Sequence, residues 1–373
     1  MPPLDVRFFT GPQGWPYLLT PFIPLAVVLD LANASAALVF ATSALGIVPT
    51  AALMGRATEE LAARSGPGIG GLLNVTFGNA PELIIALFAL GSGLHEVVKA
   101  SIIGSIIGNI LLVLGGAMFV GGIGRPKQRF NATAATVQSL MLFLAAAALI
   151  MPAIFELVEG RGLPAVGAER VDYGSTVEHL SLAVAIVLIG TYVAGLLFSL
   201  KTHRDIFNPP GEHDLEEAEF GWSARRSIMM LAIAGVAVGV MSEVLVGSIS
   251  DASQSVGLSE FFIGVIIVAI VGNAAEHWVA VLVAHKDKMN LAVNIAIGSS
   301  AQVALFVAPV LVVASFFLGP APMPLVFNGF ELGAILLAVL IANVVTHEGE
   351  STWFEGVQLL AVYAILVLAF AFA

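Results

Sequence analysis

The chain alternates long apolar runs with short polar segments, and this pattern predicts membrane-spanning helices. About 20 apolar residues are needed for a helix to cross the hydrocarbon core of a bilayer. Asp30 and nearby prolines make the first run the least regular. We count eleven runs, near residues 15–32, 34–60, 68–92, 97–122, 131–157, 176–200, 223–248, 258–284, 288–314, 325–346 and 352–372.

The composition agrees with an all-α polytopic membrane protein. Hydrophobic residues make up 58% of the chain and charged residues 11%, and the mean hydropathy is +0.97, too apolar for an ordinary soluble domain. The absence of cysteine excludes disulfides, thiolate metal sites and cysteine nucleophiles. A formal charge of −11 argues against nucleic-acid binding and suits a protein that handles cations.

A motif with an amide and a carboxylate occurs twice within the apolar runs. Gly78-Asn-Ala-Pro-Glu82 is followed 194 residues later by Gly272-Asn-Ala-Ala-Glu276. The same offset places Ala100–Ser105 on Asn294–Ser299. The chain is therefore predicted to be an internal duplication organised around two glutamates.

The duplication divides the chain into halves. We predict an N-terminal segment with an extra helix (1–33), a five-helix repeat (34–200), a linker (201–222) and a second five-helix repeat (223–373). Because five is odd, consecutive repeats cross the membrane in opposite directions. Many secondary transporters have this plan and bind substrate where the repeats meet.

The basic residues support one orientation. With the N-terminus in the cytoplasm and the C-terminus outside, 12 of the 15 Lys and Arg residues face the cytoplasm. Only Lys99, Arg161 and Arg170 face outward. This is the bias that the positive-inside rule expects, and we expect an integral protein of a prokaryotic plasma (inner) membrane.

Each motif predicts a metal-binding face on its helix. Asn79 precedes Glu82 by three residues, and Asn273 and Glu276 repeat this spacing, so amide and carboxylate share a face. Charged residues are rare in membrane spans and are a functional-site hypothesis by default. Two carboxylates and two amides meeting across a pseudo-two-fold axis would form the oxygen-rich site that calcium prefers.

Glycines within the motifs suggest further ligands. Gly78 and Gly272, with Pro81 in the first copy, are expected to let each helix break and free backbone carbonyls. Irregular backbone at this depth is tolerated only where it is buried in protein or lines a cavity. Pro81 also has a purely structural interpretation, as a kink.

The helix after each motif is expected to supply a second layer of polar groups. Helix-to-helix hydrogen bonding is an equally weighted alternative for each of these side chains taken singly. Glycines 104, 108 and 298 are expected to allow close packing. The predicted lining residues are Ser101, Ser105 and Asn109 in the first half and Asn294, Ser299, Ser300 and Gln302 in the second.

The paired glutamates suggest an exchange mechanism. Burial disfavours a bare carboxylate, so each glutamate should be stable when protonated or when neutralised by a cation. Calcium and protons would then compete for the same oxygens, which is the mutual exclusion that an antiporter needs.

Other acidic residues have weaker assignments. Glu59 and Glu243, in the first helix of each repeat, are predicted vestibule acids on an ion or proton path, or else only interfacial. His277 is expected to pack against a neighbouring helix rather than to relay protons. The linker acids would either sense cytosolic calcium or form a solvated linker, and they are Glu212, Asp214, Glu216, Glu217 and Glu219.

Two other function classes lack their motifs. His347-Glu-Gly-Glu350 is not the His-Glu-x-x-His zinc pattern, since residue 351 is serine. There is no Walker sequence, so nothing suggests ATP-driven pumping or another enzymatic activity. We expect no cofactor, with calcium as the transported ion.

The doubled motif resembles that of the calcium/proton exchanger (CAX) family of the calcium/cation antiporter superfamily. The resemblance extends over nearly the whole chain and includes Lys99-Ala-Ser-Ile-Ile-Gly-Ser105 and Ile297-Gly-Ser-Ser-Ala-Gln302. It implies ten helices in inverted repeats plus one, with Glu82 and Glu276 exchanging calcium for protons. Two features depart from it. Pro81 is similar to the Pro-Glu of sodium/calcium exchangers, and Lys99 stands where some relatives carry glutamine.

The leading hypothesis is an antiporter that exports cytosolic calcium in exchange for protons by alternating access. A sodium-coupled exchanger of the same fold is the first alternative, although Ala80 and Ala274 add no hydroxyl or carboxylate beside the motif asparagines. A passive cation channel is the second. The expected partners are calcium, protons and the lipid bilayer, and a homo-oligomer is compatible with the sequence.

Overall fold

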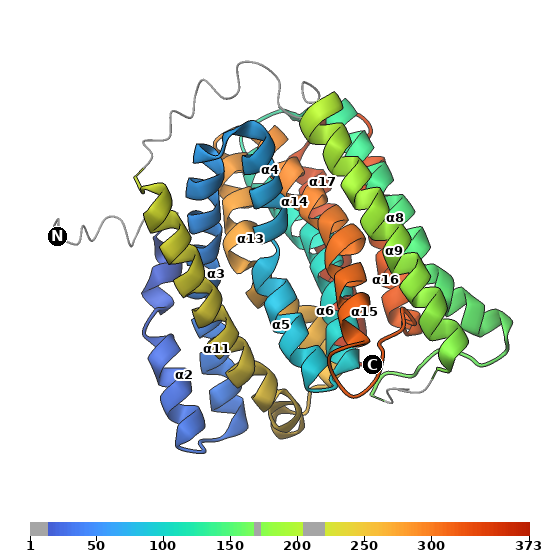
Figure 1. Cartoon of the computed structure of the whole chain (residues 1–373). Helices are drawn as coiled ribbons and strands as arrows, with labels where there is room; N and C mark the ends of the chain where they lie inside the picture. The colour runs from blue at the N-terminus through green and yellow to red at the C-terminus, as the bar shows by residue number, and fades with distance from the viewer. Residues whose placement is uncertain (1–13, 168–172, 204–220) are drawn as a thin grey trace.

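The protein is a bundle of roughly aligned helices (Figure 1). This computed structural model describes residues 14–167, 173–203 and 221–373. In the element labels, η1 is a 3₁₀ segment and the other η segments are π-helical. The elements are η1 (Trp15–Leu19), α2 (Phe22–Leu31), α3 (Ala36–Arg64), α4 (Gly66–Phe77), α5 (Ala80–Gly91), α6 (His95–Ile107), η2 (Gly108–Val113), α7 (Leu114–Gly122), β1 (Gln128–Arg129), α8 (Ala132–Val158), α9 (Ser175–Leu197), η3 (Phe198–Thr202), α11 (Ala224–Val256), α12 (Glu260–Phe262), η5 (Ile263–Val268), α13 (Ala269–His285), α14 (Met289–Gln302), η6 (Val303–Val307), α15 (Ala308–Ser315), α16 (Gly329–Thr346), β2 (Glu350–Ser351) and α17 (Trp353–Ala371).

The predicted all-α membrane fold is confirmed, and two of the eleven expected spans differ from simple long helices. Within the described residues, nine helices are long and apolar enough to cross a membrane. The first expected span is a short apolar helical stretch, Trp15–Leu31, in a proline-containing sequence. The third is divided between α4 and α5.

The two motif helices differ in continuity. The first breaks as predicted, because α4 ends at Phe77 and α5 begins at Ala80. Pro81 has no N–H to donate to the carbonyl four residues earlier, which weakens the helix at this point. The predicted break at Gly272 is wrong: α13 continues through it. The residue equivalent to Pro81 is Ala275, which keeps its backbone donor.

The helices after the motifs share another irregularity. Gly108–Val113 and Val303–Val307 are both π-helical. They follow Ser105 and Ser299, which occupy the same position in the two repeats. Short π segments inside α-helices occur frequently at functional sites. The two halves therefore share local backbone geometry here as well as sequence.

The halves of the chain pack across each other rather than forming separate domains. Elements α3 and α11 lie side by side along their length, and α6 crosses η5. At this crossing a Cβ on Gly104 would lie 2.0 Å from the carbonyl oxygen of Val265. The glycine thus permits close approach of an element from each half.

A short two-stranded sheet joins two loops that are far apart in the sequence. In the predicted orientation these loops lie on the cytoplasmic side. Strands β1 and β2 are antiparallel, with Arg129 opposite Glu350. Lys127 and Arg129 lie 2.5 and 3.2 Å from the Glu350 carboxylate. The hydrogen bond from Lys127, with help from Arg129, lowers the pKa of the Glu350 carboxyl. The strand pair and these ion pairs therefore connect the loop before α8 with the loop before α17.

Candidate functional site

The two motifs meet through a reciprocal contact between glutamate and glycine. A Cβ on Gly272 would lie 3.1 Å from Cγ of Glu82, and a Cβ on Gly78 would lie 3.6 Å from Oε1 of Glu276. Glu82 is in the first turn of α5, whereas Glu276 is within α13. Their charges are close enough to repel each other. Each glycine thus gives room to the glutamate of the other motif.

Three acceptor oxygens of the motifs are buried without a hydrogen-bond partner in the described part of the chain. They are Oε2 of Glu82, Oδ1 of Asn79 and Oδ1 of Asn273. Buried polar atoms are normally paired, because leaving one unsatisfied costs about 1–3 kcal/mol. Oxygens left over from two amides and a carboxylate are suited to a hard cation.

The nitrogens of the same amides are held by the other half of the chain. Asn79 Nδ2 donates to Gln302 Oε1 at 2.6 Å, and Asn273 Nδ2 donates to Ser105 Oγ at 3.1 Å. Each motif asparagine therefore bonds the helix that follows the other motif. These bonds use the side-chain nitrogens as donors, and the side-chain oxygens of Asn79 and Asn273 remain as unused acceptors.

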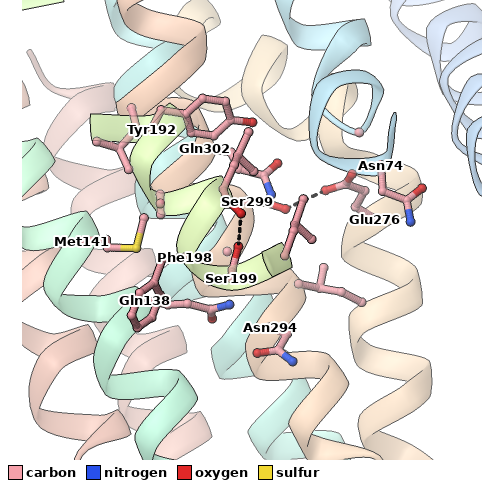
Figure 2. Close-up of a pocket in the computed structure, with 18 residues that line it drawn as sticks. Asn74, Gln138, Met141, Tyr192, Phe198, Ser199, Glu276, Asn294, Ser299 and Gln302 are labelled. Carbon is pink, nitrogen blue, oxygen red and sulfur yellow. Dashed lines mark hydrogen bonds between the residues drawn. The ribbon is translucent and has the colours of Figure 1, made fainter. Parts of the chain in front are cut away.

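The other predicted lining residues make several kinds of bond. Ser299 Oγ donates to Glu276 Oε2 at 3.0 Å (Figure 2). Asn109 Oδ1 lies 3.1 Å from His277 Nε2, so the histidine contacts a neighbouring helix, as we expected. Ser101 bonds the carbonyl of Val98, and Ser300 bonds those of Ala296 and Ile106, so both hydroxyls serve the backbone.

A cavity of about 410 Å³ reaches Glu276 from one side. Gly78, Ser299 and Gln302 line it, together with residues that the sequence analysis did not select. Asn74 is one of these, and its place one turn before Gly78 on α4 could have identified it. Gln138 on α8 and Tyr192 on α9 lie in helices without a motif, so no sequence signal singled them out.

The vestibule acids lie on α3 and α11. Glu59 is close enough to Glu276 for electrostatic repulsion, and the exposed Glu243 is on α11. Their predicted role on an ion path stays a prediction. The predicted calcium-sensing residues of the linker, Glu212 to Glu219, lie outside the described residues.

The charged ligands at this site are few. In the part of the chain that the structure describes, no three His, Cys, Asp or Glu residues cluster in a way that could hold a metal. A cation bound by the two motifs would therefore rely on neutral oxygens beside the two carboxylates. Such a mixed set suits reversible occupancy, because the site can also be neutralised by protons on the carboxylates.

Comparison with known proteins gives a family and similar transport proteins for this chain. The family model described as sodium/calcium exchanger protein matches residues 35–201 and 226–372. The chain is 44% identical over 371 residues to the Ca(2+)/H(+) antiporter of Synechocystis sp., covering 95% of this chain and 96% of that protein. It is 45% identical over 350 residues to the Ca(2+)/H(+) antiporter ChaA of Bacillus subtilis, covering 93% and 96%.

A solved structure has the same fold. The crystal structure of the selenium-substituted Ca2+/H+ antiporter protein YfkE superposes with a TM-score of 0.80 at 40% sequence identity. The match covers 99% of this chain and 100% of that chain. The similarity therefore includes both motifs and the helices that surround them.

Proposed function

Because the chain belongs to the sodium/calcium exchanger protein family, we propose that it is a secondary antiporter that exports cytosolic calcium in exchange for protons. It is a membrane transport protein rather than an enzyme, as the sequence indicated. The names of its relatives support calcium and protons as the exchanged ions. The observation that carries the proposal is the pair of motif glutamates, each packed against the glycine of the other motif.

Calcium and protons would compete at this pair. Calcium would bind the Glu82 and Glu276 carboxylates and the free oxygens of Asn79 and Asn273, with Gly78 and Gly272 allowing the close approach. Protonation of both glutamates would remove the negative charge that attracts the ion. Because the same oxygens serve both ions, release of one permits binding of the other.

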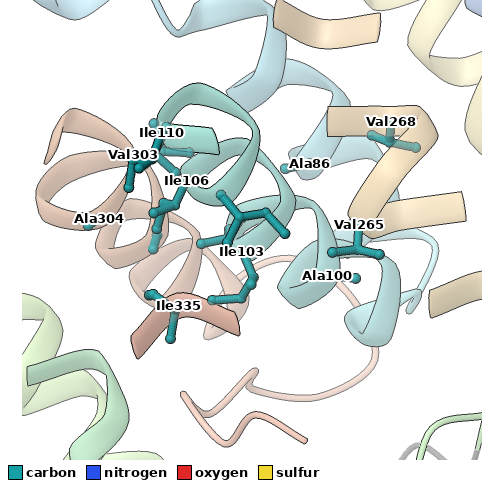
Figure 3. Packing of buried hydrophobic residues seen from close by; sticks show 14 of the residues in the cluster. Ala86, Ala100, Ile103, Ile106, Ile110, Val265, Val268, Val303, Ala304 and Ile335 are labelled. Atoms are coloured by element: carbon teal, nitrogen blue, oxygen red, sulfur yellow. The ribbon is translucent and has the colours of Figure 1, made fainter. Parts of the chain in front are cut away.

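Alternating access is supported by the unequal surroundings of the pair. The cavity approaches Glu276 from the side that the basic residues assign to the cytoplasm. Beyond Glu82, α5 continues with the buried Ile85, Ala86, Ala89 and Leu90. Figure 3 shows Ala86 in the same apolar cluster as Ile103 of α6 and Val268 of η5. The site would then be open to the cytoplasm and closed to the outside.

The repeat organisation belongs to the same proposal. Residues 34–200 and 223–373 would be repeats of opposite orientation in a prokaryotic plasma membrane, with 1–33 outside the duplication and 201–222 as the cytoplasmic linker. The reciprocal contacts of the two asparagines support this pseudo-symmetry.

The test is calcium uptake into sealed vesicles that contain the purified protein. An imposed proton gradient without sodium should drive uptake, and uptake should consume the gradient. Glu82→Gln and Glu276→Gln should each abolish it. Asp251→Asn, an exposed acid on α11, is the matched control and should transport normally.

Two results would replace the proposal. Uptake driven only by sodium would assign sodium coupling, despite Ala80 and Ala274 beside the motif asparagines. Downhill calcium movement without proton counterflow would indicate a channel.

A further inference from the structure

The cavity next to Glu276 has a wall that is polar but almost uncharged. Among the described residues that line it, Glu276 is the only one with a charged side chain. The far wall carries amides and a hydroxyl from three elements: Gln138 on α8, Asn294 on α14 and Ser199 on η3. Figure 2 shows all three below Tyr192 in this view, with Gln138 near Ser199 and with Asn294 apart from them on the neighbouring helix.

Gln138 has an unused acceptor in this wall. Its Oε1 is buried without a hydrogen-bond partner among the described residues. Its Nε2 would lie 3.7 Å from a Cβ on Gly298, so the amide rests against a position that has no side chain. A rotation of the Gln138 side chain would present this acceptor to a water or cation in the cavity that the residue lines.

These groups lie near one end of their helices. Gln138 is six residues after Ala132, where α8 begins, and Asn294 is five residues after Met289, where α14 begins. At 1.5 Å per residue, both lie about 10 Å or less from the start of their helix. Ser199 is two residues before Lys201. All three ends are cytoplasmic in the predicted orientation.

We propose that Gln138, Asn294 and Ser199 form an entry site that holds a partly hydrated divalent cation before it reaches the paired glutamates. This inference rests on the proposed function. A cavity of about 410 Å³ accommodates an ion with several waters, since one water occupies about 30 Å³ in the liquid. The wall oxygens would replace or hydrogen-bond part of that water shell.

The neutral character of the wall suits an entry site. Conduction through a narrow path requires binding strong enough for entry and weak enough for release. Amide and hydroxyl dipoles bind more weakly than carboxylates, so an ion would pass on to Glu276, where the charge is. A further carboxylate in the wall would hold the ion short of the exchange site.

The test measures the initial rate of proton-driven uptake as a function of calcium on the predicted cytoplasmic side, which faces the medium in inside-out vesicles. Gln138→Met keeps the length of the side chain and removes its oxygen, and Asn294→Leu does the same for the second amide. Each should raise KM for calcium about two- to tenfold, the effect of losing one polar contact, with little change in kcat. Thr136→Val, at an exposed position of α8, should leave KM unchanged.

A change in the opposite direction separates ion binding from folding. Gln138→Glu adds a charge at the entry site and should lower KM for calcium while slowing turnover. A packing defect would not move KM in opposite directions in the methionine and glutamate variants. An unchanged KM in Gln138→Met and Asn294→Leu overturns the entry site if the unaltered chain exchanges calcium for protons. Failure of the unaltered chain to exchange would instead overturn the proposed function.

Discussion

At the scale of single residues, the main role of the motif glycines is to make room for a neighbouring side chain rather than to break the helix. The sequence suggested that Gly78 and Gly272 break their helices, yet only the copy containing Pro81 is broken. What the two glycines share is the glutamate packed against each of them. The same residue type in both repeats therefore reflects the space that a partner side chain needs.

Gly272→Ala should weaken calcium binding. The added methyl would lie 3.1 Å from Cγ of Glu82, so the glutamate must move by a few tenths of an ångström. An overpacking cost of about 1 kcal/mol corresponds to a roughly fivefold higher KM for calcium in the vesicle assay. Gly247→Ala, where a Cβ meets nothing within 4 Å, should have no effect. An unchanged KM in Gly272→Ala would show that Glu82 need not stay in this place.

Ser299→Ala should make calcium transport more sensitive to acid. The Ser299 hydroxyl donates to the Glu276 carboxylate, and such a bond favours the charged form over the protonated form. Without it, protons compete better, so the pH of half-maximal uptake should rise by about one to two units, because bonds to charged groups contribute roughly 1.5–3 kcal/mol.

The neighbouring serine provides the control. The Ser300 hydroxyl donates to the backbone carbonyls of Ala296 and Ile106, so Ser300→Ala should keep the pH profile of the unaltered chain. Equal shifts in the two variants would contradict a specific role for Ser299.

At the scale of elements, the sequence predicted the motif helices better than their contacts. The repeated spacing identified Ser105 and Ser299, and Gln302 was expected as a polar residue of the helix after the second motif; the partners of all three belong to the two motifs. No simple residue pattern predicts the π segments after the motifs. The sequence also does not show which of the glycines lie where two helices come close together. Of the three glycines expected to allow close packing, Gly104 faces a backbone carbonyl, a Cβ on Gly298 would make only an ordinary contact, and one on Gly108 would meet nothing within 4 Å.

Gly104→Ala should therefore destabilise the protein, while Gly108→Ala should not. A Cβ at 104 would lie 2.0 Å from the Val265 carbonyl oxygen, which forces α6 and η5 apart. We expect a cost of about 1–3 kcal/mol, seen as a lower melting temperature of the purified protein in detergent. Similar melting temperatures for both variants would mean that the crossing can relax freely.

At the scale of the whole molecule, hydropathy and charge predicted the fold class. The packing of one half of the chain against the other could be seen only in the structure. Runs of apolar residues indicate spans because the bilayer sets their length. Which spans touch depends on side-chain shape along each helix, and the pattern of apolar residues does not encode it. For this reason the glutamate pair could be predicted from the repeat, whereas Gln138 and Tyr192, in helices without a motif, could not be placed beside it.

The opposite orientation of the halves gives a prediction at equivalent positions. Ser92 and Lys286 are exposed and stand 194 residues apart, the offset of the duplication, so they are the same position in the two repeats. Inverted repeats put them on opposite faces of the membrane. Since the chain has no cysteine, Ser92→Cys and Lys286→Cys each introduce a single thiol, which a membrane-impermeant maleimide can report in intact cells.

Ser92→Cys should react from outside, and Lys286→Cys should react only after the cells are opened, because the excess of basic residues assigns its loop to the cytoplasm. Reaction of both thiols from outside would mean that the repeats run in parallel, and the pseudo-two-fold relation between Glu82 and Glu276 would then lose its basis. The reverse labelling pattern would agree with inverted repeats but would show that the protein has the opposite orientation in the membrane. In that case the cavity beside Glu276 would open to the outside, and the exchange site would stand in its outward-facing state.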